Sequence, residues 1–105
     1  RSFKSGRIFP SVNPNTIADG LRTQLADLTF AVIRENVEDI VTVTEAEIVN
    51  AMKFLWERMK LVVEPSGAVS LAGLLKMSDR LRGAKTGVII SGGNIDLSQF
   101  FSTFL

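Results

Sequence analysis

The chain has 105 residues, with 12 Lys and Arg against 11 Asp and Glu, and it contains no His, Cys or Tyr. Its length is near the commonest single-domain size, and 46% hydrophobic residues indicate a folded chain rather than a disordered one. A net charge of +1 gives no basic surface for nucleic acid. Without His or Cys the chain can hold neither a Ser-His-Asp triad nor a thiolate or imidazole metal site. No apolar run approaches the ~20 residues of a membrane-spanning helix, so we expect no membrane partner.

The first predicted helix follows an irregular segment of residues 1–12. Asn13 is a residue type that caps helices, and Pro14 is favoured at the first helical position. The apolar side chains that follow recur every three to four residues, which predicts one buried face on a helix ending near Asn36. These side chains are Ile17, Leu21, Leu25, Leu28 and Val32.

Two more helices are predicted in the middle of the chain. Thr44 and Glu47 have the spacing of a capping box and open a helix that should stop before Pro65. A third helix should follow to about Leu81, with Gly83 closing it. It is apolar over much of its circumference, so we expect it to be well buried.

Two short segments have the composition of strands. Residues 39–43 are rich in β-branched side chains, and residues 87–90 form the continuous apolar run of a parallel strand covered on both faces. Residues 96–104 predict a short last helix. Helices alternating with strands predict an α/β fold in which helices pack on a mostly parallel sheet. Two strands alone make a poor sheet, so these strands should need further neighbours.

The clearest candidate for a ligand site is the turn at residues 91–94, directly after the second strand. Ligands of open α/β sheets bind at that edge. Glycine allows the backbone to approach a ligand closely, and Ser91 supplies a hydroxyl group that can donate or accept a hydrogen bond. An ordinary strand-to-helix turn explains the same residues, and spacing alone favours that simpler interpretation.

Other positions allow a functional and a structural interpretation. Glu64 lies between apolar neighbours and can serve a ligand if it is buried, although a carboxylate facing water at a helix end is simpler. Gly20 interrupts the first predicted helix at a cost of about 0.5–1 kcal/mol relative to Ala, which indicates close packing, ligand approach or a weak first turn. Arg58 and Lys60 lie near the C-terminal end of a predicted helix, where positive charge stabilises the helix through its dipole. Binding of an anionic effector is a second interpretation.

Three segments in this order resemble the C-terminal part of the serine racemase and threonine (serine) dehydratase family. They are TIADG at residues 16–20, WERMKLVVEPSG at residues 56–67 and SGGNID at residues 91–96. Members of that family are pyridoxal-phosphate (PLP) enzymes of the tryptophan-synthase β-like fold, fold type II. The resemblance covers nearly the whole chain. It implies that residues 1–105 are the C-terminal segment of a larger cofactor-binding domain, with the N-terminal part of the enzyme absent from this chain.

The resemblance also assigns roles to individual residues. Ser91 is expected to bond the pyridine nitrogen of PLP, and Gly20 to lay its backbone against cofactor and substrate. Glu64 is expected beside the cofactor ring, and Gly92 belongs to the same cofactor-binding turn as Ser91. Three further residues match positions near a nucleotide effector site between subunits: Arg58, Lys60 and Asn94.

According to the resemblance, no catalytic residue lies in this chain. The Schiff-base lysine, the glycine-rich phosphate loop and the carboxylates for Mg²⁺ or another divalent cation are expected upstream of Arg1. Lys4 belongs to a Ser-Phe-Lys sequence that looks like the Schiff-base motif. The continuation at residues 5–7 departs from that motif, and the position is wrong for it, so we interpret Lys4 as a solvated loop lysine.

The implied function is that of a PLP-dependent ammonia-lyase or racemase acting on a small β-hydroxy amino acid in a cytoplasmic homodimer. The Cα proton is removed, and β-elimination then gives a keto acid and ammonia, or reprotonation gives the other isomer. The sequence does not distinguish racemase from dehydratase, nor serine, threonine and 3-hydroxyaspartate as substrates. The alternative is a non-catalytic α/β interaction or binding module derived from this fold. Alone, residues 1–105 should be inactive and should associate or stay loosely packed, because apolar surfaces would lack partners.

Overall fold

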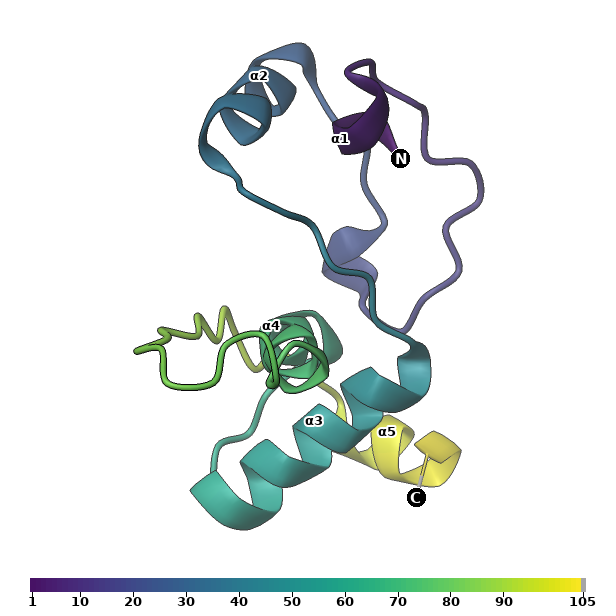
Figure 1. Ribbon diagram of the computed structural model, residues 1–105. Coiled ribbons are helices and arrows are strands. Elements are labelled where there is room, and N and C mark those ends of the chain that lie inside the picture. Colours follow the sequence, from purple (N-terminus) through teal and green to yellow (C-terminus); the bar gives the residue numbers. More distant parts are fainter. Residues whose placement is uncertain (105) are drawn as a thin grey trace.

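In the computed structural model, which describes residues 1–104, short helices are joined by long extended segments (Figure 1). No β-strand forms within this described part. The helices in chain order are α1 (Ser2–Ser5), the 3-10 helix η1 (Asp19–Leu21), α2 (Asp27–Asn36), α3 (Glu45–Met59), α4 (Pro65–Lys76) and α5 (Leu97–Phe104).

Helix α3 begins where the capping-box pattern predicts. The backbone N–H of Glu47 donates to Oγ1 of Thr44 at 3.2 Å, and the backbone N–H of Thr44 donates to Oε2 of Glu47 at 2.6 Å. The helix ends at Met59, earlier than the predicted stop before Pro65. Lys60 takes a left-handed backbone conformation with φ 59°, and its ammonium group donates to the carbonyl of Glu57 at 2.8 Å. These two features end the helix before proline can.

The last two helices confirm the predicted elements with changed boundaries. Helix α4 begins at Pro65, where proline loses no hydrogen bond because its missing N–H would lack a partner in the helix. It ends at Lys76 rather than near Leu81. Gly83 has φ 82° and lies in the turns that follow the helix, not at its end. Helix α5 occupies the predicted range.

The core forms where α3 and α4 pack against each other. Small side chains on α4 allow the two helices to approach closely, and residues from the segments before and after them close the core. Met52, Leu55 and Val63 are its largest fully buried side chains. The other buried members are Ala18, Ile48, Ala51, Ala68, Ala72 and Phe100.

The predicted helix from Pro14 to Asn36 is wrong over its first half. Only the three-residue η1 and the later α2 are helical, and residues 22–26 connect them without helical turns. Ala18 is buried in the core of α3 and α4, whereas Phe30 is the buried residue of α2. The two ends of the segment therefore bury their side chains in different places.

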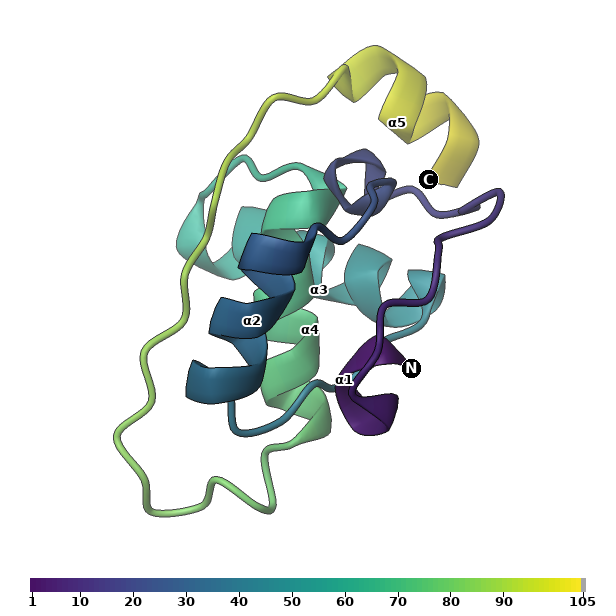
Figure 2. The same ribbon diagram turned by 90° about the horizontal axis from the view of Figure 1, so that it is seen from above.

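The expected apolar face of this segment is also wrong. Leu28 and Val32 are 80% and 53% exposed. Asn13 has φ 46° and begins no helix. Helix α2 packs against α1, and both lie to one side of α3 and α4 (Figures 1 and 2).

The two predicted strands are irregular segments without strand partners among residues 1–104. Lys76 donates from its ammonium group to the carbonyl of Thr42 at 2.9 Å, and the Ser70 hydroxyl donates to the carbonyl of Ile89 at 2.7 Å. Side chains of α4 thus bond these segments where a sheet would use neighbouring strands. The sheet of the predicted α/β fold is therefore absent from the described residues, and the helices are present. In Figure 2 the connection from the end of α4 to α5, which contains the second segment, follows an open arc.

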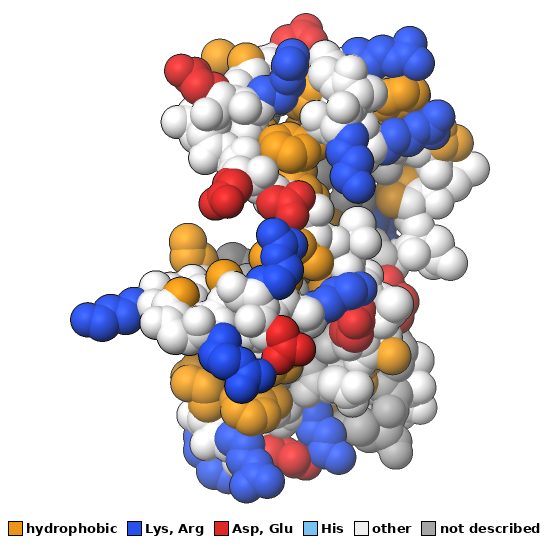
Figure 3. Space-filling model, in the orientation of Figure 1, with side chains coloured by type: hydrophobic (Ala, Val, Ile, Leu, Met, Phe, Trp, Pro, Cys, Tyr) orange, Lys and Arg blue, Asp and Glu red, His pale blue; other side chains and the backbone are white. Residues whose placement is uncertain are grey.

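The chain is more open than a compact domain of its length. Its radius of gyration is 15.0 Å, against about 13 Å expected for a compact domain of about 100 residues. Ile89, in the second predicted strand, is 81% exposed. Figure 3 shows apolar patches among the charged side chains and a notch between the α1–α2 part and the α3–α4 part. The helices described here are all too short or too polar to cross a membrane.

Candidate functional site

The three segments that carry the family resemblance meet at the N-terminal end of α4. The backbone N–H of Gly20 donates to Oγ of Ser66 at 3.0 Å, which joins η1 to the first turn of α4. The backbone N–H of Glu64 donates to the carbonyl of Gly92 at 3.2 Å, which joins the start of α4 to the turn before α5. Residues far apart in the chain are therefore brought to one place.

Glycines allow the chain segments to come into close contact at this junction. A Cβ atom at position 67 would lie 2.6 Å from the carbonyl oxygen of Gly92. A Cβ at position 93 would overlap the carbonyl oxygen of Val62, and one at position 92 would overlap Oε1 of Glu64. Contacts within the chain therefore explain why glycine stands at these three positions.

Glu64 is the residue directly before α4, and it is half-buried. Its carboxylate does not cap the helix through a side-chain hydrogen bond, and Oε1 lies against Gly92. The carboxylate is therefore partly shielded from water at the helix end. Gly20 bonds the first turn of α4, and Gly92, which follows Ser91, bonds Glu64. Gly20 and Ser91 are exposed, so two of the four predicted cofactor-binding residues are open to a ligand.

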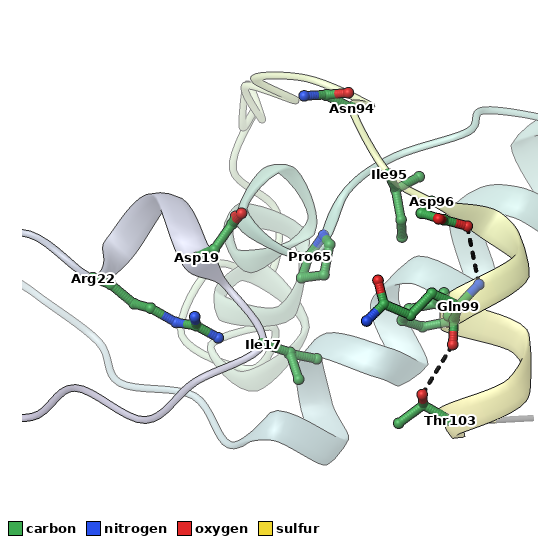
Figure 4. A pocket seen from close by; sticks show the side chains of 10 residues that line it. Ile17, Asp19, Arg22, Pro65, Asn94, Ile95, Asp96, Gln99 and Thr103 are labelled. Carbon is green, nitrogen blue, oxygen red and sulfur yellow. Dashed lines mark hydrogen bonds between the residues drawn. The ribbon is translucent and has the colours of Figure 1, made fainter.

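A pocket of about 390 Å³ adjoins this junction between η1 and α5 (Figure 4). Asp19, Asn94 and Pro65 contribute to its lining. Asp96 also lines it, but its Oδ1 accepts the backbone N–H of Gln99 at 3.0 Å and so caps α5. Asn94, one of the predicted effector residues, therefore lines the same pocket as Asp19.

The other predicted effector residues are elsewhere. Arg58 and Lys60 are exposed at the C-terminal end of α3, and neither lines the pocket that contains Asn94. Lys4 is exposed on the one-turn helix α1, where it lines a different pocket with Phe3 and other residues. It is a helical lysine rather than the expected loop lysine. Within residues 1–104, His, Cys, Asp and Glu form no group of three or more that could hold a metal ion.

Sequence reasoning missed Ser66. Its Oγ accepts the N–H of Gly20 and donates to Oδ1 of Asp19 at 3.4 Å, so this hydroxyl touches two residues of the TIADG segment. Its place next to Glu64 and Pro65, inside a segment that carries the resemblance, is a signal that points to it.

Comparison with known proteins agrees with the resemblance. The family model described as pyridoxal-phosphate dependent enzyme matches residues 1–92. The chain is 52% identical over 101 residues to an L-threo-3-hydroxyaspartate ammonia-lyase of Saccharomyces cerevisiae, covering 95% of this chain and 31% of that protein. It is also 52% identical over 103 residues to a serine racemase of Dictyostelium discoideum, covering 94% and 32%.

Solved structures show the same relationship. The structure of a serine racemase from maize matches with a TM-score of 0.86 and 43% identity, over 96% of this chain and 33% of that one. A crystal structure of a threonine deaminase matches with a TM-score of 0.85 and 43% identity, over 91% and 35%. The match to fold type II enzymes is confirmed, although the chain itself carries no strand within residues 1–104. The chain spans about a third of the length of these relatives.

Proposed function

The chain belongs to the family of pyridoxal-phosphate-dependent enzymes, and on that premise we propose that it forms part of the cofactor-binding domain of an ammonia-lyase or racemase. The substrate would be a small β-hydroxy amino acid, and the products a keto acid with ammonia, the opposite isomer, or both. The observation that carries this proposal is the meeting of Gly20, Glu64 and the 91–94 turn at the start of α4.

The residues at this junction fit a flat aromatic cofactor. Gly20 is exposed and has no side chain to obstruct a ring lying against its backbone. Ser91 is also exposed, and its hydroxyl group can bond a ring nitrogen. Glu64 adds a half-buried carboxylate that no helix cap engages.

When bound, PLP supplies an electron sink for the carbanion formed at the substrate Cα. Residues of this chain would orient the PLP ring and set how strongly it withdraws electrons. The hydroxyl of Ser91 is neutral and cannot hold the ring nitrogen protonated as a carboxylate does, which favours β-elimination and racemisation over transamination. Because Gly20 has no side chain, the cofactor ring can lie directly against its backbone. Glu64 places a carboxylate at the edge of the site.

The remaining parts of the active site would come from other segments of the full-length protein. These are the lysine that binds the cofactor, the phosphate loop, the groups that hold the substrate carboxylate and any divalent-cation ligands. A cytoplasmic homodimer belongs to the same proposal, with a nucleotide effector site between its subunits. Arg58 and Lys60 would reach that site from one region of this chain and Asn94 from another.

The test is an assay of the full-length protein that contains this chain, loaded with PLP. L-serine, L-threonine and L-threo-3-hydroxyaspartate are offered separately, and keto acid, ammonia and the D-isomer are measured. Turnover of at least one of them supports the proposal. A protein that retains PLP but converts none of the three contradicts the proposed substrate class. A protein that retains no PLP favours the alternative of a non-catalytic module.

A further inference from the structure

Helix η1 is a short element with few ties to the rest of the molecule. Its backbone hydrogen bonds are local, from Leu21 to Ala18 at 2.9 Å and from Arg22 to Asp19 at 3.0 Å. The burial of Ala18 attaches it to the core, but apolar contact is not directional. The bond from the Gly20 N–H to Ser66 Oγ is a directional tie to α4.

The Ser66 hydroxyl is itself oriented. Oδ1 of Asp19 accepts the N–H of Gly20 at 2.8 Å and the hydroxyl of Ser66 at 3.4 Å. A hydroxyl group can donate one hydrogen bond and accept others, so Oγ of Ser66 can serve Asp19 and Gly20 at the same time. Three groups thus close a small network in which one side chain from α4 fixes one backbone amide of η1.

We propose that Ser66 is a positioning residue of the cofactor site, which holds the Gly20 backbone at the start of α4 at the distance that the cofactor ring requires. This inference rests on the proposed function, because it acts through Gly20. Ser66 does not need to touch the cofactor. Its effect is to keep the surface formed by Gly20, Glu64 and Gly92 in one arrangement before the cofactor binds.

Steric contact supports the same coupling. A Cβ atom added to Gly20 would lie 3.0 Å from Oγ and 3.3 Å from Cβ of Ser66. The glycine at position 20 and the serine at position 66 therefore constrain each other directly, so a change at one alters the effect of a change at the other.

Helix α4 offers a matched control one turn later. Ser70 also uses its hydroxyl to tie α4 to another segment, donating to the carbonyl of Ile89 at 2.7 Å. Ser70→Ala removes a hydroxyl group from the same helix that donates to the carbonyls of Gly67 and Ile89, without touching Gly20. A general loss of helix anchoring would affect both variants equally.

The experiment titrates PLP into the cofactor-free full-length protein and follows the visible absorbance of the bound cofactor. Ser66→Ala is expected to weaken PLP binding by roughly threefold to tenfold, the effect of one lost neutral hydrogen bond. Ser66→Thr, which keeps the hydroxyl, and Ser70→Ala should bind PLP as the unmodified protein does. PLP affinity that is unchanged in Ser66→Ala, or lowered equally in Ser70→Ala, overturns the proposal and leaves the proposed function standing. Failure of the unmodified protein to bind PLP overturns both.

A double-mutant cycle tests the steric coupling of Gly20 and Ser66 independently of the hydrogen bond. Gly20→Ala should weaken PLP binding less in the Ser66→Gly background than in the unmodified protein, because the contacting Oγ and Cβ are gone. Equal weakening in both backgrounds would show that the two residues act independently and would overturn the proposal.

Discussion

Glu64 and Gly92 contact each other through both backbone and side chain. The N–H of Glu64 donates to the carbonyl of Gly92 at 3.2 Å, and Oε1 of Glu64 occupies the space that a Cβ of residue 92 would need. The carboxylate can lie where it does only because position 92 is glycine. This pair therefore connects the turn that carries Ser91 to the start of α4.

Gly92→Ala and Gly93→Ala should have different effects. The new Cβ at position 92 meets Oε1, the end of a flexible side chain, so the Glu64 carboxylate should move while stability changes little. The new Cβ at position 93 meets the carbonyl of Val62, which is backbone and cannot rotate away, so we expect a destabilisation of about 1–3 kcal/mol. Denaturant unfolding measures both variants in the full-length protein, and equal loss of stability would contradict this account.

Ser91→Ala should weaken PLP binding by roughly threefold to tenfold, because one neutral hydrogen bond to the ring is lost. The residue is exposed, so the free energy of unfolding of the cofactor-free protein should stay unchanged. Ser98→Ala is the matched control, an exposed serine of α5 to which no cofactor role is assigned. Titration with PLP measures the affinity of each variant, and only Ser91→Ala should bind PLP more weakly. Equal affinities for the two variants would remove Ser91 from the site.

The capping box of α3 should make stability depend on pH. The backbone hydrogen bond from Thr44 is the largest cause that lowers the pKa of Glu47 below its usual 4.5, and the Thr44 hydroxyl and Lys76 act in the same direction. Because the folded pKa is the lower one, the contribution of Glu47 is fully present above the unfolded pKa near 4.5. It is lost as pH falls through the lowered folded value.

Glu47→Gln tests this directly, since glutamine can also complete a capping box but does not titrate. The difference in unfolding free energy between the two proteins, measured by urea titration, should shrink as pH falls below about 4.5. A difference that stays constant from neutral to acidic pH would contradict the assigned role.

Residues 1–105 expressed alone should associate. Ile89 is 81% exposed and Leu28 80%, and extended segments without strand partners can pair with other chains. Sedimentation measures the outcome. A compact monomer that melts in one sharp transition would contradict this prediction.

Sequence patterns correctly predicted the helix starts that depend only on residues close together in the chain. The capping box at Thr44 and the proline that begins α4 confirm this, because neighbouring residues suffice to form them. The helix predicted from Pro14 failed because Ala18 and Phe30 are buried in different places, which depends on distant packing. The predicted strands failed for a similar reason, since a strand needs neighbours to bond its backbone.

The candidate site shows the same division. Gly20, Glu64 and Gly92 were predicted from the family resemblance, and the structure brings them to one junction, although their role in binding remains a prediction. Ser66 was missed because its importance comes from a contact with a residue far away in the chain. Spacing within one segment cannot reveal such a contact.

The most direct test of the central claim is a crystal structure of the full-length protein with PLP bound. We predict that the pyridine nitrogen lies within hydrogen-bond distance of the Ser91 hydroxyl, with the Gly20 backbone against the cofactor and the phosphate held by residues outside this chain. A cofactor bound without contact to Ser91, Gly20 or Glu64 would contradict the account.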